Sequence, residues 1–295
     1  MKRALLLINC NCRNGRASRD RIIAELQAAD IQVRMPEFND VEELERHLHL
    51  SRSEVDLVII AGGDGTLNAA AKTLVPTQLP IGLIPCGTAN DLARTLDIPA
   101  DITQAVNIIA AGHARAVDVG HVNDCYFFNV ASIGMSAELA SALTSEIKKR
   151  FGRFGYALAA IRVLMRAKPF HANIVRAGAT HRSYTLQIAD GNGRYYGGGN
   201  VIERSARIDD GLLDLYSLEF AEAWRMLFRL RAFSRGEHVD YDDVHFMSGA
   251  DFEIRTRRPR PVNADGEIVT TTPARFRIVP KAIRIFAPEP AETEP

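Results

Sequence analysis

The sequence predicts an α/β protein of two domains, in which a doubly wound parallel sheet is followed by a mainly antiparallel β domain. Continuous apolar runs alternate with helical stretches up to about residue 115, which is typical of a parallel sheet covered by helices on both faces. Strand-like segments then follow one another closely, as they do in antiparallel sheets. The length of 295 residues also exceeds what a single core usually organises.

The first domain is expected to alternate strands and helices in regular order. Its strands are predicted at residues 4–10, 31–35, 56–60 and 81–85. Helices are predicted at 18–29, which Ser18 begins, at 39–48, which opens with a capping residue, and after Gly65. Ligands of such sheets bind at the carboxyl ends of the strands, so the loops at that edge are the candidate site.

The second domain is expected to consist mainly of strands. They are predicted at residues 115–122, 125–131, 171–177, 183–189, 212–219, 244–255, 274–279 and 282–286, with helical patterns at 136–168 and 221–234. We therefore assign residues 1–120 to the first domain and 121–288 to the second, with the last residues before the tail allowed to return to the first. The Pro- and Glu-rich tail, 289–295, is expected to be disordered.

Composition and charge limit the partners and the cellular compartment that we expect for this protein. Lys and Arg together number 36, as do Asp and Glu, so net charge gives no attraction to nucleic acid and no such partner is expected. No stretch reaches the ~18 apolar residues of a transmembrane segment. The apolar run from Ala4 to Ile8 is too short for a signal peptide. The four cysteines form no C-x-x-C pair, which favours reduced thiols, and we expect a cytoplasmic protein.

Three glycine-rich segments each follow an apolar run. They are "NCNCRNG" (9–15), "GGDGTLN" (62–68) and "PCGTAND" (85–91). All three would lie at one edge of the parallel sheet, where N–H groups at helix N-termini can hold phosphates. Each alone could be an ordinary turn, but together they predict a nucleotide pocket. The sequence contains neither a G-x-x-x-x-G-K-S/T motif nor H-R-D and D-F-G, which excludes P-loop enzymes and protein kinases.

Three acidic residues, Asp64, Asp91 and Asp118, end or follow strands on the same side. A carboxylate beside a phosphate is repelled by it unless Mg²⁺ lies between them, and Mg²⁺ is often held by a few carboxylates, phosphate oxygens and water. We therefore predict that these acids help to hold Mg²⁺. The simpler alternative makes Asp91 and Asp118 helix-capping or turn residues.

The stretch "NADGE" (263–267) places two acids, Asp265 and Glu267, around Gly266. The glycine allows a tight turn, so that both carboxylates can point into one site. A hydroxyl group has a high pKa and needs a positioned base before it can attack a phosphate. The alternative is a plain hairpin turn, for which Asp-Gly is a common signal.

Taken together, the motifs resemble the diacylglycerol kinase catalytic family, specifically its soluble bacterial lipid-kinase branch. The resemblance rests on the motifs "GGDGTLN", "PCGTANDLAR", "GNGRYYGGGN" (191–200), "RIDDGLLDL" (207–215) and "NADGE", which occur in that order. Together with the first loop they run from residue 9 to residue 267, nearly the whole chain. It implies an NAD-kinase-like α/β N-terminal domain, a β-sandwich C-terminal domain, and the use of ATP and Mg²⁺ to phosphorylate a lipid at the membrane surface.

The resemblance also implies roles for particular residues. ATP would be contacted by Asn9, Gly62, Gly63, Asp64, Gly65, Thr66, Leu67, Asn68 and Thr88. Asp64, Asp91 and Asp118 would belong to a metal-and-water network. Asp210 would hold a structural Mg²⁺, assisted by the backbone carbonyls of Arg207 and Leu212. Asp265 and Glu267 would form the catalytic acid pair, with Glu267 as proton acceptor.

The chain departs from the family pattern at its first loop, which has Asn9-Cys10 where Asn-Pro is usual, and at residues 36–38, where an ATP-contacting Thr is missing. Two other functions stay open. One is a kinase of a soluble substrate, of the NAD kinase type, against which "PCGTAND" and "GNGRYYGGG" argue. The other is a noncatalytic lipid- or nucleotide-binding regulator, against which the intact "GGDGT" and "NADGE" argue.

The helical pattern within 146–168 combines an apolar stripe with positive charge. Its cations include Lys148, Lys149, Arg150 and Arg153. Such a helix can lie at a membrane surface rich in anionic lipid, although a helix packed on the second domain has the same periodicity. The basic run at 255–261 could contact phosphates or headgroups, or could simply be solvated.

Overall fold

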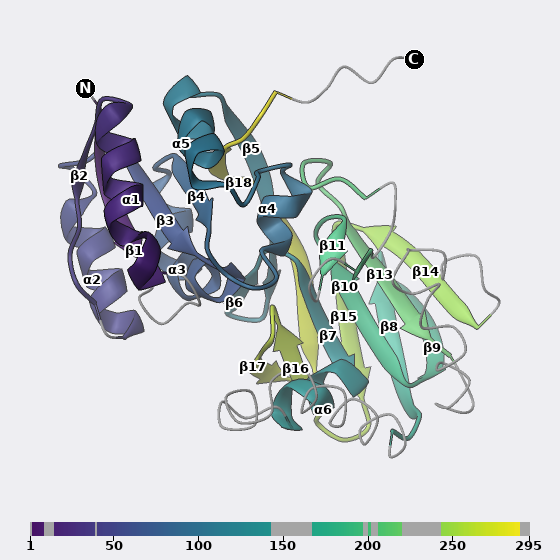
Figure 1. Ribbon diagram of the computed structural model, residues 1–295. Coiled ribbons are helices and arrows are strands. Elements are labelled where there is room, and N and C mark those ends of the chain that lie inside the picture. The colour runs from purple at the N-terminus through teal and green to yellow at the C-terminus, as the bar shows by residue number, and fades with distance from the viewer. Residues whose placement is uncertain are drawn as a thin grey trace. The chain divides into compact units, whose positions relative to one another are not determined.

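The computed structural model describes residues 2–8, 15–38, 40–142, 167–196, 200–201, 206–219 and 243–289. The chain forms two compact units (Figure 1). The first contains the residues up to Val119 and again those from Pro280, and the second contains Gly120–Val279. The second domain was assigned residues up to 288, with the last residues before the tail allowed to return to the first, and the chain is back in the first unit from Pro280. The physical reason is strand pairing, since Ile285 lies beside Ile81 in the parallel sheet of the first unit.

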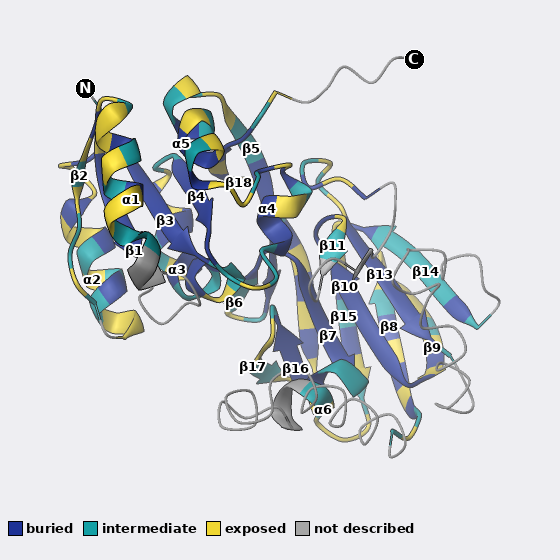
Figure 2. Cartoon of the chain, viewed as in Figure 1, coloured by how far each residue is buried: buried dark blue, intermediate teal, exposed yellow. Residues whose placement is uncertain are grey.

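The first unit is a doubly wound α/β domain, as predicted. Its parallel strands lie in the order β2 (Ile31–Arg34), β1 (Lys2–Ile8), β3 (Leu57–Gly62) and β4 (Ile81–Pro85), followed by the end of β18 (Ala274–Phe286). Its helices are α1 (Gly15–Ala28), α2 (Val41–Ser51), α3 (Asp64–Thr77), α4 (Asp91–Thr95) and α5 (Ile102–Ala111). Every residue of β3 is buried, because helices cover both faces of a parallel sheet (Figure 2).

Local sequence signals set the ends of these helices. Asp40 caps α2 by accepting a hydrogen bond from the Glu43 amide at 2.8 Å, and Asp101 caps α5 in the same way through Gln104 at 3.0 Å. Gly112 ends α5 with a φ of 80°, a conformation that glycine adopts without a steric penalty. Helix α3 differs, because its N-cap is Gly63, which has no side chain to satisfy the first amides. We therefore describe the candidate site from the turn after β3, where α3 begins, and from the turn after β4.

The second unit is a β-sandwich. One sheet has the order β14–β13–β10–β7–β16–β17. The other pairs the start of β18 with β15, β15 with β8, and β8 with β9. Strand bounds are β5 (Ala114–Val122), β6 (Cys125–Phe127), β7 (Val130–Gly134), β8 (Phe170–Arg176), β9 (Ala179–Thr185), β10 (Gln187–Gly191), β11 (Tyr195–Tyr196), β12 (Asn200–Val201), β13 (Leu213–Leu218), β14 (Val244–Gly249), β15 (Asp251–Thr256), β16 (Pro261–Ala264) and β17 (Glu267–Thr271).

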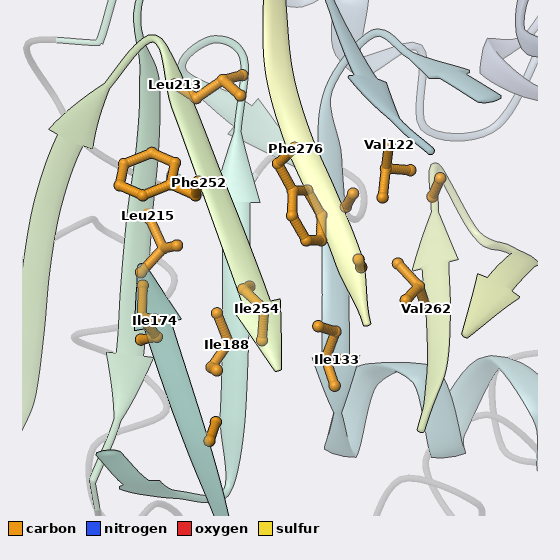
Figure 3. Packing of buried hydrophobic residues seen from close by; sticks show 14 of the residues in the cluster. Val122, Ile133, Ile174, Ile188, Leu213, Leu215, Phe252, Ile254, Val262 and Phe276 are labelled. Atoms are coloured by element: carbon orange, nitrogen blue, oxygen red, sulfur yellow. The ribbon is translucent and has the colours of Figure 1, made fainter. Parts of the chain in front are cut away.

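The core of the sandwich lies between these two sheets. Figure 3 shows side chains of Ile174, Phe252, Ile254 and Phe276 from one sheet among those of the other. The facing side chains include Ile133, Ile188, Leu213, Leu215 and Val262. Each fully buried side chain of this size contributes about 1.5–3 kcal/mol relative to an exposed one. One helix of this unit, α6 (Met135–Ala142), packs against β16 and β17.

Some elements differ from those expected. The strand predicted at 183–189 is two strands that belong to different sheets and meet at Leu186, and the one at 244–255 divides at Ala250 into β14 and β15. A strand that changes sheets keeps its alternating pattern, so the sequence does not mark the break. The predicted strands 274–279 and 282–286 are one bent strand, β18, with Lys281 at a φ of 51°.

Several predictions fall on residues outside the described ranges. They concern Asn9 and its loop, the helix at 221–234, the tail from residue 290, and residues 143–166 of the predicted helix 136–168. Where the chain is described again, Ala167 and Lys168 are not helical. Among the described residues, no helix is long and apolar enough to cross a membrane.

Candidate functional site

The glycine-rich turns after β3 and β4 lie directly against each other. A Cβ added at Gly87 would lie 2.5 Å from the Cα of Gly63, and one added at Gly63 would lie 3.0 Å from the Cα of Gly87. The Cys86 amide also donates a hydrogen bond to the Gly62 carbonyl at 2.9 Å. Two of the three predicted glycine-rich segments therefore meet at one edge of the sheet, and the close backbone contact explains why both carry glycine.

Helix α3 begins at this contact. The amides of Thr66 and Leu67 bond to the Gly63 carbonyl at 3.0 and 3.3 Å, so the helix is formed from its first turn. Gly65 is exposed, and no atom lies within 4 Å of the position that its Cβ would take. An open helix N-terminus attracts anions through its N–H groups and its dipole. This end of α3 can therefore bind a phosphate group.

Asp64 has a structural role that the sequence did not reveal. Its two carboxylate oxygens accept hydrogen bonds from the amides of Asp91 and Leu92, at 3.1 and 3.2 Å, which lie at the start of α4. The carboxylate at the beginning of one helix thus caps the beginning of the next, an arrangement that both helix dipoles favour. It also brings the predicted metal-network residues Asp64 and Asp91 to neighbouring turns.

Asn90 completes the second turn. Its Oδ1 accepts a hydrogen bond from the Gly87 amide at 3.0 Å, and its Nδ2 donates to the Gly87 carbonyl at 3.2 Å. Asn90 has a φ of 52°, a conformation that Asn tolerates better than most residues. Sequence reasoning did not single out Asn90, although it lies inside the quoted "PCGTAND". Thr88, a predicted ATP contact, is exposed in the same turn.

Asp118 lies elsewhere in the same unit. It is buried on β5, and its Oδ1 accepts a hydrogen bond from the amide of Lys281 at 2.6 Å, at the bend of β18. This contact joins β5 to the bend of β18, and a part of Asp118 in the metal network stays a prediction. Within the described parts of the chain, no three His, Cys, Asp or Glu side chains are grouped as direct ligands of a metal ion.

The donor chemistry at Asp64 and Asp91 nevertheless fits Mg²⁺. Each carboxylate oxygen has a second lone pair after accepting one hydrogen bond. Mg²⁺ prefers oxygen ligands and keeps several waters, so it needs only one or two carboxylates from the protein. Asp64 could therefore serve both the amides of α4 and a hydrated metal ion.

The "NADGE" stretch forms a tight β-hairpin in the second unit. Asp265 and Gly266, with φ angles of 47° and 98°, make the two-residue turn between β16 and β17. The Asp265 carboxylate accepts hydrogen bonds from the amides of Phe128, Asn129 and Val130 at 2.6, 3.0 and 3.0 Å. Glu267 is exposed at the start of the edge strand β17. The Asp265 carboxylate is thus anchored to residues 128–130 of the neighbouring segment, while the Glu267 side chain is exposed to solvent.

The predicted structural Mg²⁺ site lies in the turn before β13. Asp210 is exposed, and its Oδ1 accepts a hydrogen bond from the Leu212 amide at 3.0 Å across Gly211, which has a φ of 74°. Arg207 lies three residues before Asp210, and its Nε donates a hydrogen bond to Oδ1 of Asp209 at 3.2 Å. The exposed carboxylate is available to a hydrated cation, and metal binding by Arg207, Asp210 and Leu212 stays a prediction.

A fully buried carboxyl group, Asp190 on β10, was also missed from the sequence. Neither of its oxygens has a hydrogen-bond partner among the described residues. Burial, together with the negative charge of Asp214, raises the pKa of the Asp190 carboxyl well above its usual range. The acid sits in the apolar stretch "LQIAD", so the pattern around it indicated only a buried strand.

Comparison with known proteins assigns both units. A family model for the diacylglycerol kinase catalytic domain matches residues 3–122, and one for the YegS C-terminal NAD kinase beta sandwich-like domain matches residues 129–287. The chain is 30% identical to the diacylglycerol kinase of Staphylococcus carnosus over 81% of its length and 78% of the relative's. It is 32% identical to that of Staphylococcus epidermidis over 84% and 78%. It also resembles the crystal structure of a diacylglycerol kinase from Bacillus anthracis, with a TM-score of 0.80, 25% identity and 97% coverage of each chain.

Proposed function

The chain belongs to the diacylglycerol kinase family, and from that premise we propose that it transfers the γ-phosphate of ATP to a hydroxyl group of a membrane lipid. The observation that carries the proposal is the contact between Gly63 and Gly87, which joins two turns at the N-terminus of α3. Diacylglycerol is the acceptor we favour, since relatives at 30–32% identity are named diacylglycerol kinases, and phosphatidylglycerol is the second candidate.

The triphosphate is proposed to bind at residues Gly62–Asn68, with Thr88 and Asn9 as further contacts. Backbone amides at the start of α3 and the helix dipole attract the phosphates. Asp64 and Asp91 would hold Mg²⁺, which neutralises charge that develops on the phosphoryl oxygens. Because the Asp64 carboxylate also caps α4, the same residue keeps the two turns in register.

The acceptor hydroxyl is proposed to be activated by Glu267. A hydroxyl attacks phosphorus faster when a nearby base takes its proton, and Glu267 is exposed and able to reach one. Asp265, whose carboxylate is occupied by three backbone amides, holds the hairpin in place. The two acids of "NADGE" therefore have different tasks in this proposal, one structural and one chemical.

The test is a phosphorylation assay with labelled ATP, Mg²⁺ and vesicles that contain diacylglycerol, phosphatidylglycerol or a sphingoid base, with NAD as the soluble comparator. Glu267→Gln should lower turnover by ~10²–10⁴, the usual contribution of a general base, with ATP affinity nearly unchanged. Glu253→Gln makes the same change at a partly exposed site in the second unit, where the carboxylate pairs with Arg255, and should leave turnover as it was. Phosphorylation of NAD alone, or of nothing, would overturn the proposed function, whereas normal turnover in Glu267→Gln would overturn the role of Glu267 as the base.

A further inference from the structure

The three residues from Phe128 to Val130, which lead from β6 into the start of β7, are held from two sides. Their amides all donate to Asp265, at 2.6–3.0 Å. Their carbonyls accept hydrogen bonds from other residues. Asn192 donates from its side-chain Nδ2 to the Phe128 carbonyl at 3.2 Å and from its backbone N–H to the Asn129 carbonyl at 2.8 Å. The Val130 carbonyl accepts from the Asp265 amide at 3.0 Å. One short segment thus connects "GNGR" with "NADGE".

Burial makes these contacts strong. Asn192 is 1% exposed, and Phe128 and Asn129 are 1% and 5% exposed, so water does not replace a lost bond easily. Hydrogen bonds are stronger in such surroundings, and an unmade one is costly. The peptide groups of the segment are therefore fixed in the one orientation that points three amides at Asp265.

The position of Asp265 in turn sets that of Glu267. The two acids are separated only by Gly266, in a turn whose two residues both have positive φ angles. A shift of the Phe128–Val130 segment would move the anchor of the hairpin, and a displacement of about 1 Å at a reacting group can cost ~10² in rate.

We propose that Asn192 is a positioning residue for phosphoryl transfer, acting through Phe128–Val130 and Asp265 on the hairpin that carries Glu267. The inference rests on the proposed function. It explains why an amide side chain stands at this position, because a carboxylate could not donate to the Phe128 carbonyl and would repel it.

The experiment compares Asn192→Asp and Asn192→Leu, which remove the Nδ2 donor with and without adding charge. Each should lower kcat about 10- to 100-fold, with the ATP dissociation constant within about twofold of wild type. At acidic pH an aspartic acid regains an O–H donor, so the rate of Asn192→Asp relative to wild type should recover as pH falls, whereas that of Asn192→Leu should not.

Asn123→Asp is the matched control. Asn123 also donates from its Nδ2, to Oγ1 of Thr270 at 3.0 Å, but among the described residues it makes no hydrogen bond to the Phe128–Val130 segment, and its variant should keep the wild-type kcat. Amide hydrogen exchange of residues 128–130 should be faster in both Asn192 variants and unchanged in the control.

The outcomes separate the two proposals. A wild-type protein that phosphorylates no lipid removes the proposed function. An active wild type with normal kcat in Asn192→Leu, or with unchanged exchange at residues 128–130, overturns the role of Asn192. If both Asn192 variants lose ATP affinity and melting temperature along with turnover, Asn192 only supports folding, and the inference fails.

Discussion

The contact between the two glycine turns should make Gly87→Ala strongly destabilising. The new Cβ would lie 2.5 Å from the Cα of Gly63 and 2.7 Å from Oδ1 of Asn90, where ordinary contacts begin at 3.4 Å. The Cβ would lie 0.9 Å closer to the Gly63 backbone than an ordinary contact allows (3.4 minus 2.5). Because that neighbour is backbone and not the end of a flexible side chain, the two turns must separate. The φ of Gly87 is not positive, so the effect is one of contact and not of backbone conformation.

The magnitude follows from these contacts. Overpacking of this kind costs about 1–3 kcal/mol, and loss of the bond from the Gly87 amide to Asn90 adds about 1 kcal/mol. We expect a decrease of about 2–4 kcal/mol in the free energy of unfolding, measured by urea denaturation followed by circular dichroism. The KM for ATP should rise in the same variant, because the amides proposed to bind phosphate move with the turn.

Gly65→Ala is the control for this reasoning. Gly65 lies in α3 with nothing within 4 Å of the added methyl group, and alanine is the better helix former. We expect it to raise the free energy of unfolding by about 0.5–1 kcal/mol. If Gly87→Ala is as stable as wild type, or if the two variants change stability equally, the two turns are not in the contact described.

Three further predictions concern acidic residues. Asp64→Ala should abolish phosphoryl transfer and, by removing the cap of α4, lower stability by about 1 kcal/mol; wild-type turnover at saturating Mg²⁺ would rule out the metal role. Because the pKa of Asp190 is raised in the folded protein, the folded state keeps a proton that the unfolded state releases above pH ~4. The contribution of this carboxyl group to the free energy of unfolding is therefore full below pH ~4 and is lost as pH rises toward the raised folded pKa, by at most about 1.4 kcal/mol per pH unit. Asp190→Asn should therefore flatten this part of the pH dependence and be the more stable protein at neutral pH, and a melting series from pH 4 to 8 that matches wild type would contradict the burial argument. Asp210→Ala should reduce the rise in melting temperature on adding Mg²⁺, whereas an equal rise in wild type and variant would exclude a metal site in that turn.

How much of the structure could be predicted from the sequence depends on how far apart the interacting residues lie along the chain. The strands of the first unit were predictable because a parallel strand covered on both faces must be apolar along its whole length, as β3 is. The short strands β16 and β17 were not predicted, because four or five residues of mixed polarity give no periodic signal. Asp265-Gly266 nonetheless predicted a tight turn, with a hairpin as the alternative to a site of two acids, since turn chemistry is local.

The β-sandwich was expected only from the family resemblance. The sequence by itself determined the succession of an α/β domain and a mainly antiparallel β domain, the glycine-rich turns and the acids in or near them, because periodicity, helix capping and turn preference depend on neighbouring residues. Only the tertiary structure decided what those acids contact. Asp64 caps a helix 27 residues further along the chain, and Asp265 accepts amides from residues at least 135 positions before it. The burial of Asn192 and Asp190, and the bonds that Asn192 makes to Phe128 and Asn129, likewise depend on parts of the chain far away in the sequence. Such contacts arise when the chain packs, and no local pattern encodes which amides a given carboxylate will meet.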